Sequence, residues 1–130
     1  MKKPHPEFLT LAEVIAIHNN QIENYGGKSG IRDLSLLNSA VAVPQSTFDR
    51  KYLHEDLFDM AAAYAYHICR NHPFIDGNKR VALVSALVFL DLNNIDINDP
   101  HNILYNVMID IASGNISKKD LGSIFRKLSK

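Results

Sequence analysis

The chain has 130 residues, of which 46% are hydrophobic, and its 14 lysines and arginines balance its 14 aspartates and glutamates. This length suits a single domain, residues 1–130, and the apolar content excludes a disordered chain. Because there is no net charge, no overall field attracts nucleic acid or an anionic membrane, and a phosphate site would have to be local. The only cysteine, Cys69, excludes an intrachain disulfide and favours a reducing, cytoplasmic setting.

Neither an export signal nor a membrane span is expected. The basic start of the chain reaches Glu7 before any apolar stretch of useful length. The longest apolar run, from Val81 to Leu90, is broken only by Ser85 and is shorter than the about 18 residues that a membrane span requires. This run instead predicts a buried core helix.

A capping box marks the start of the first predicted helix. The Thr10 side chain can accept a hydrogen bond from the third helical amide, while Glu13 reaches back to the start of the helix. Apolar residues then recur at helical spacing from Leu11 to Ile22. The pair Gly26-Gly27 is expected to end this helix.

The next three segments differ in their patterns. A short helix is expected over about 34–43, ended by Pro44. Segment 44–56 is polar and has no clear period, which predicts a loop or a short hairpin. A strong amphipathic helix follows over 57–71, and Pro73 is expected to end it because residues before proline avoid the helical region.

The second half of the chain also shows helical patterns. Gly77 or Asn78 begins a helix that runs to about Leu92 and is apolar nearly all round, which is typical of a central core helix. Asn93-Asn94 predicts a left-handed cap or turn. Two further helices are expected, one over about 102–113 and one that Ser117 and Asp120 cap. The fold class is therefore all-α.

Charged and polar residues gather in the loop where the central helix begins. The first amides of a helix lack partners within it, and the helix dipole places partial positive charge there. Lys79 and Arg80 add full positive charges in this turn, where cations are otherwise unfavourable, so an anion, most naturally phosphate, is expected. Gly77 lets the backbone approach a ligand closely, and Asn78 can cap the helix or bind the ligand.

Two more residues of this loop suggest catalysis. Asp76 lies beside the expected phosphate, and a carboxylate there usually holds a divalent cation, most often magnesium. His72, four residues earlier, can take a proton from an incoming hydroxyl. Phe74 and Ile75 are both expected to point into the core and fix the loop, as catalysis by positioning requires.

Each of these residues also has a simpler interpretation. Alone, His72 would be a turn or surface residue, Asp76 would be a helix cap, and the two cations would form a solvated face. The combination of a base, an acid, a glycine and two cations within nine residues favours an active site.

The loop His72-Pro73-Phe74-Ile75-Asp76-Gly77-Asn78-Lys79-Arg80 resembles the signature of the Fic/Doc superfamily, His-x-Phe-x-Asp/Glu-Gly-Asn-Gly/Lys-Arg. Within that superfamily the chain resembles the death-on-curing (Doc) toxins, and the similarity runs over nearly the whole chain. It includes Tyr25-Gly26-Gly27, Gly30-Ile31-Arg32-Asp33, Ala61-Ala62-Ala63-Tyr64 and the stretch from Ala82 to Asn93.

The resemblance implies a compact Fic/Doc helical domain with the active-site loop at the N-terminus of a central buried helix. It implies ATP as nucleotide substrate and Mg²⁺ as cofactor. The implied roles are general base for His72, metal binding for Asp76, and phosphate contacts for Gly77, Asn78 and Arg80, beside which Lys79 adds its charge. Segment 44–56 is assigned by position to the flap that docks the backbone of the target protein.

The family contains two chemistries. Doc toxins phosphorylate a threonine of elongation factor Tu, whereas most other Fic proteins attach AMP to hydroxyl side chains. Many AMP-transferring relatives have a second arginine where this chain has Leu83, and they often have glycine where it has Lys79, so we favour transfer of the γ-phosphoryl group. Gly77 argues the other way, since the best-known Doc protein has alanine there.

Two other functions are weighed against a transferase. A catalytically silent nucleotide-binding or phosphate-binding module would need neither His72 nor Asp76, yet both are present. A metal-dependent hydrolase is disfavoured because the six histidines are scattered, with no pair at close helical spacing.

The control of the activity is expected to come from a partner. The only near match to the inhibitory pattern Ser/Thr-x-x-x-Glu-Gly/Asn of some Fic proteins runs from Asn19 to Asn24, and it lacks the initial Ser or Thr. A separate antitoxin is therefore expected, with a disordered segment that folds as it binds near the active site.

Overall fold

The structure, a computed structural model, describes residues 5–130, so the basic residues at positions 2 and 3 that entered the export prediction lie outside it. Among the described residues, no helix has both the length and the apolar character needed to cross a bilayer. The elements in chain order are α1 (Leu11–Tyr25), α2 (Leu34–Ala42), the 3₁₀ turn η1 (Val43–Gln45), β1 (Thr47–Phe48), β2 (Lys51–Tyr52), α3 (Leu57–Asn71), α4 (Asn78–Leu92), α5 (Leu104–Ala112) and α6 (Lys118–Leu128).

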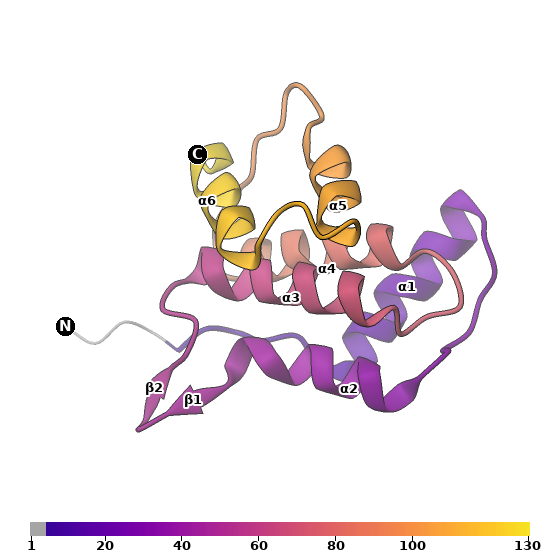
Figure 1. Ribbon diagram of the computed structural model, residues 1–130, viewed down its shortest axis with the longest axis horizontal. Coiled ribbons are helices and arrows are strands. Elements are labelled where there is room, and N and C mark those ends of the chain that lie inside the picture. The colour runs from indigo at the N-terminus through magenta and orange to yellow at the C-terminus, as the bar shows by residue number, and fades with distance from the viewer. Residues whose placement is uncertain (1–4) are drawn as a thin grey trace.

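Helices α3 and α4 form the centre of the molecule, and a short loop joins them. Figure 1 shows α1 and α2 on one side of this pair and α5 and α6 on the other. The only sheet over residues 5–130 is the antiparallel pair β1–β2, in which Thr47 lies opposite Tyr52. The expected all-α fold class is confirmed, and the short hairpin falls inside the segment where a loop or hairpin was predicted.

The helix ends follow the local signals in the sequence. The capping box of Thr10 and Glu13 is formed, and α1 ends at Gly26, whose φ of 85° is left-handed. Helix α6 begins with the predicted capping box at Ser117. Helix α5 begins at Leu104, two residues later than expected. The reason is the Asp99 carboxylate, which accepts hydrogen bonds from the Ile103 amide (2.9 Å) and the Leu104 amide (3.0 Å).

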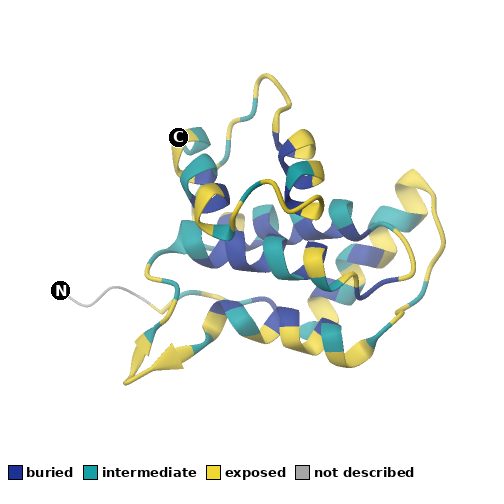
Figure 2. Cartoon of the chain, in the orientation of Figure 1, coloured by how far each residue is buried: buried dark blue, intermediate teal, exposed yellow. Residues whose placement is uncertain are grey.

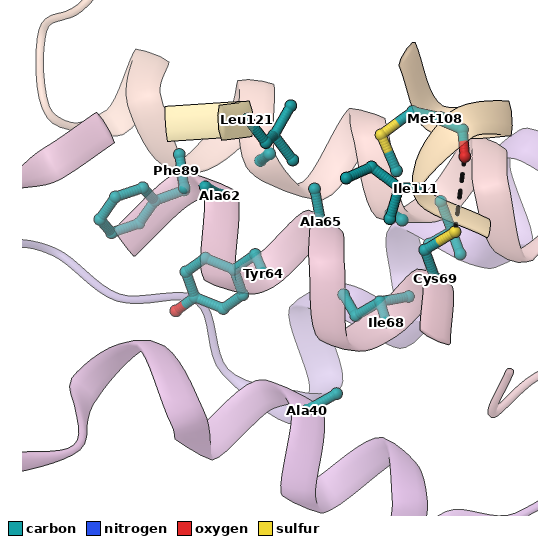
Figure 3. Packing of buried hydrophobic residues seen from close by; sticks show 14 of the residues in the cluster. Ala40, Ala62, Tyr64, Ala65, Ile68, Cys69, Phe89, Met108, Ile111 and Leu121 are labelled. Atoms are coloured by element: carbon teal, nitrogen blue, oxygen red, sulfur yellow. Dashed lines mark hydrogen bonds between the residues drawn. The ribbon is translucent and has the colours of Figure 1, made fainter. Parts of the chain in front are cut away.

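The core lies along the facing sides of the central helices. Figure 2 shows that buried residues run along most of α3 and α4, in keeping with the prediction of a buried central helix. Tyr64 of α3 packs against Phe89 of α4 with ring centroids 5.2 Å apart, and Leu121 and Met108 close the core from α6 and α5 (Figure 3). The buried Tyr64 hydroxyl accepts a hydrogen bond from the Leu9 amide at 2.8 Å, so it is not left unpaired.

A cationic side chain joins α6 to α3 and to the segment before α3. The Lys118 ammonium donates to Nε2 of His54 and to Nε2 of His67, each at 3.0 Å. Both imidazoles must then be neutral, because a protonated ring nitrogen offers no lone pair. Burial, followed by the charge of Lys118, lowers the pKa of His67 from 6.5 to about 4. The same two causes lower the pKa of His54.

The contacts of Lys118 with His54 and His67 make the stability of the fold depend on pH. In the unfolded chain His67 takes up a proton near pH 6.5, whereas in the folded chain it does so only at about pH 4. Since the unfolded state binds more protons between these values, the free energy of unfolding should fall as the pH is lowered from about 6.5 to about 4. His67→Gln keeps an acceptor for Lys118 without titrating, so urea denaturation across this range should show a shallower slope for it than for the wild type.

The matched control for this prediction is His101→Gln, since His101 is exposed. It should keep the slope of the wild type. An unchanged slope in His67→Gln would show that His67 titrates normally in the folded protein.

Candidate active site at the start of the central helix

The loop between α3 and α4 turns sharply at His72. This residue is the C-cap of α3, is exposed, and has a left-handed φ of 51°. The Arg32 side chain fixes the turn from outside, donating from Nε to the His72 carbonyl (2.6 Å) and from one terminal nitrogen to the Asn71 carbonyl (2.9 Å). The backbone of His72 is therefore held while its imidazole faces solvent.

Phe74 and Asn78 lock the loop to the core. The Phe74 side chain is fully buried, as expected. The buried Asn78 amide accepts from the Phe74 N–H (2.9 Å) and donates to the Phe74 carbonyl (3.0 Å). Because this buried amide is used within the loop, the group of Asn78 that lies on the first turn for a ligand is its backbone N–H.

Ile75 corrects one expectation. It was predicted to point into the core, but it is 50% exposed. Phe74 forms an antiparallel bridge with Ile31, and the Ile75 amide donates to the Gly30 carbonyl at 3.1 Å, so this stretch is extended. Successive side chains of an extended chain point to opposite sides. With Phe74 inside, Ile75 is forced outward.

The same pairing shows which segment borders the loop. Segment 44–56, assigned to the flap by position, forms the β1–β2 hairpin before the N-terminus of α3, while the loop follows its C-terminus (Figure 1). A helix of 15 residues separates them by about 22 Å at about 1.5 Å per residue. The segment that actually lies against the loop is 27–33, and nothing in its composition marked it as a partner of the loop.

Asp76 presents an ionised carboxylate at the loop surface. One oxygen accepts from the Gly77 N–H (2.8 Å) and the other from the Lys28 N–H (3.0 Å). The hydrogen bonds from Lys28 and Gly77 hold the pKa of Asp76 below its usual value, and the charge of Arg80 acts in the same direction. The carboxylate is thus charged near neutral pH and exposed to solvent.

The first turn of α4 is open toward a ligand. Gly77 precedes the helix with a left-handed φ of 77°, which favours glycine, and no side chain caps the helix start. The N–H groups of Asn78, Lys79 and Arg80 belong to the first turn and therefore have no carbonyl partner one turn earlier within the helix. Together with the helix dipole they favour an anion at this position.

A pocket of about 380 Å³ opens over this turn. His72, Asp76 and Lys79 contribute polar groups to it, and Arg80 also lines it. The Arg80 guanidinium reaches toward the end of α1, where one nitrogen lies 3.4 Å from the Gln21 carbonyl and 3.3 Å from the Gly26 carbonyl. Arg80 thus joins the pocket to α1. The complete lining is Cys69, Arg70, His72, Ile75, Asp76, Gly77, Asn78, Lys79, Arg80, Tyr105 and Ala112.

Four lining residues were not predicted from the sequence, and two of them, Arg70 and Tyr105, bring a charge or an aromatic ring. Arg70, on the last turn of α3, donates to the carbonyls of Ile111 (3.3 Å) and Ala112 (3.1 Å) and adds a third cation to the pocket. Tyr105, from α5, brings an exposed aromatic ring. Arg70 lies two residues before His72 and could have been included with the loop, whereas the approach of α5 depends on tertiary packing.

Phe74→Ala should test whether the loop depends on its anchor. Removal of a fully buried aromatic ring should lower the free energy of unfolding by about 3–5 kcal/mol. The neighbouring variant Ile75→Ala is a matched control and should cost about 1 kcal/mol or less, because that side chain is half exposed. Chemical denaturation of both variants provides the measurement. Equal losses in the two variants would contradict the inward–outward alternation.

Comparisons with known proteins identify similar sequences. The family model described as Fic/DOC family matches residues 8–90, which include α1 and the whole loop. The chain is 34% identical over 116 residues to the protein kinase doc of Escherichia phage P1, covering 89% of this chain and 90% of that protein. It is 41% identical over 73 residues to the toxin Doc of Mycolicibacterium smegmatis, covering 56% of each chain. The chain therefore belongs to the Fic/DOC family.

Proposed function

We propose that this chain is a toxin that modifies a protein, moving the γ-phosphoryl group of ATP to a serine or threonine hydroxyl of a translation factor similar to elongation factor Tu. The observation that carries the proposal is the pocket over α4, where a free imidazole, an ionised carboxylate and a lysine surround unpaired helix amides. The chain acts, in this proposal, as one domain over residues 1–130 in the cytoplasm, with no direct contact to nucleic acid or membrane.

The phosphates of ATP would lie on the first turn of α4. The N–H groups of Asn78 and Lys79 supply hydrogen bonds, and the left-handed φ of Gly77 leads the backbone into this turn. The side chains of Lys79 and Arg70 add charge from two walls of the pocket. Tyr105 offers an aromatic face against which the base of the nucleotide can pack.

Asp76 fits a magnesium ion that binds together with the nucleotide. No three His, Cys, Asp or Glu side chains within residues 5–130 cluster into a metal site of their own. Magnesium is commonly held by one or two carboxylates plus phosphate oxygens and water, so a single ionised, exposed carboxylate beside the phosphate surface suffices. Bound there, the ion would neutralise charge on the transferred phosphoryl group.

His72 is the proposed general base. The hydroxyl oxygen of the target attacks the γ-phosphorus while the bond from that phosphorus to the β,γ-bridging oxygen breaks, and ADP leaves. The hydroxyl proton passes to a ring nitrogen of His72. The exposed imidazole on a fixed backbone suits this role, because it can face a protein substrate without moving the loop.

The γ-phosphate is favoured over AMP transfer by the charges around the pocket. AMP transfer expels pyrophosphate, whose charge needs support further along α4. Position 83 supplies none, since Leu83 packs against the core. Lys79 instead places its charge at the first turn. The chain also aligns over most of its length with a relative named as a protein kinase. Gly77 supports the second candidate, AMP transfer, because it leaves backbone room beside the helix start.

The target backbone would dock on the segment beside the loop instead of on the β1–β2 hairpin. Residues 30 and 31 already pair with the loop in an extended arrangement. Ile31, Leu34 and Ile75 expose apolar side chains near this pairing. An extended target segment placed here would bring its hydroxyl to His72.

The decisive experiment uses ATP labelled at one phosphate at a time. Incubation of the purified chain with magnesium and a bacterial lysate should label a target protein from γ-labelled ATP and not from α-labelled ATP. His72→Asn should reduce this labelling by about a hundredfold or more while the melting temperature stays close to that of the wild type. Asparagine is chosen because it tolerates the left-handed backbone found at position 72.

His101→Asn serves as the matched control, since it alters an exposed histidine outside the pocket, and it should keep full labelling. Label from the α-phosphate would establish AMP transfer. Nucleotide binding without any label on protein would establish a silent binding module.

The toxin activity gives a separate prediction. Expression of the wild-type chain alone should arrest bacterial growth, because the Asn19–Asn24 stretch lacks the Ser or Thr of the built-in inhibitory pattern. Control would come from a separate antitoxin whose disordered segment folds as it binds near the active site. His72→Asn should restore growth, measured as colony counts after induction, and His101→Asn should not. Normal growth with abundant active enzyme would contradict the toxin role.

A further inference from the structure

His18 is a buried polar residue that the proposed chemistry does not use. It lies in the middle of α1, 58 residues before Asp76 in sequence, and is only 1% exposed. Buried polar side chains are ordinarily hydrogen-bonded, so the partner of a buried histidine shows what it serves. The partner here is the Asp76 backbone carbonyl, 2.8 Å from Nε2 of His18.

The orientation of the His18 ring is fixed by the loop anchor. Its ring stacks on the Phe74 ring with centroids 3.9 Å apart and an angle of 6° between the planes. Phe74 is itself held by the Asn78 amide. With its plane set in this way, Nε2 of His18 is aimed at one acceptor, and that nitrogen must carry a proton to donate to a carbonyl.

This hydrogen bond sets the direction of the peptide group between Asp76 and Gly77. The peptide is planar, so a fixed carbonyl also fixes the Gly77 N–H on the opposite side of the C–N bond. That N–H donates to the Asp76 carboxylate at 2.8 Å, and the Lys28 N–H holds the other carboxylate oxygen at 3.0 Å. His18 thus orients the Asp76 carboxylate indirectly, by fixing the backbone that carries the Asp76 side chain.

We propose that His18 is a positioning residue that orients the Asp76 carboxylate for metal and nucleotide binding, from a helix that lies outside the signature loop. The proposal rests on the function proposed above, in which Asp76 holds magnesium. The groups that hold the metal-binding residue in place are known to matter for affinity, because a misdirected ligand loses the ion.

Two variants separate the hydrogen bond from the packing. His18→Phe keeps a ring that can stack on Phe74 but has no N–H for the Asp76 carbonyl. His18→Gln keeps an N–H at similar reach but has no ring. Val14→Ala is the matched control, since Val14 is buried one turn earlier on the same helix and makes no contact of this kind with the loop.

The first measurement is the magnesium concentration that gives half-maximal ATP binding, obtained by calorimetry. His18→Phe should raise it about tenfold. The magnesium concentration required by His18→Gln should lie closer to that of the wild type than the one required by His18→Phe. Val14→Ala should lower the melting temperature without changing the magnesium requirement. A magnesium requirement in His18→Phe equal to that in Val14→Ala would show that His18 only packs.

The second measurement needs neither metal nor nucleotide. Hydrogen exchange of the Lys28 and Gly77 amides, both of which donate to the Asp76 carboxylate, should be about fivefold faster in His18→Phe, with the Phe74 amide as internal reference. Unchanged exchange would overturn the positioning role even if ATP binds as proposed. If the exchange changes as expected but the wild type binds no ATP with magnesium, the proposed function and the metal role of His18 both fail.

Discussion

The bonds between the Asn78 side chain and the Phe74 backbone are the constraint on which the rest of the site depends. A loop that must present charged groups to solvent has few apolar contacts of its own, and the conformational entropy of its backbone favours disorder. One buried amide satisfies both backbone groups of Phe74, and the buried ring ties that residue to the core. Asp76 and His72 can therefore be exposed and still be held in place.

The site divides its tasks between two faces of the same loop. His18 holds the Asp76 carbonyl on the buried inner face, while Arg32 holds the His72 carbonyl from the surface. The outer face carries the imidazole, the carboxylate and Lys79 around the pocket. Such a division suits phosphoryl transfer, in which the protein acts mainly through positioning and electrostatic stabilisation.

The sequence predicted most of what local chemistry decides. Helix starts at Thr10 and Ser117 are set by side chains within three residues, so their capping boxes could be read directly. Contacts between distant segments could not be predicted from the sequence in this way. The outward direction of Ile75 and the position of segment 27–33 against the loop both follow from the pairing of Ile31 with Phe74. That pairing leaves no local pattern in a single sequence.

The nucleotide site is tested most directly by an experimental structure with magnesium and a non-hydrolysable analogue of ATP. Phosphate oxygens should lie on the N–H groups of Asn78 and Lys79, the metal ion on the Asp76 carboxylate, and the γ-phosphate should face His72. An α-phosphate facing His72 would contradict phosphoryl transfer. Phosphates bound away from the first turn of α4 would show that this loop is not the nucleotide site.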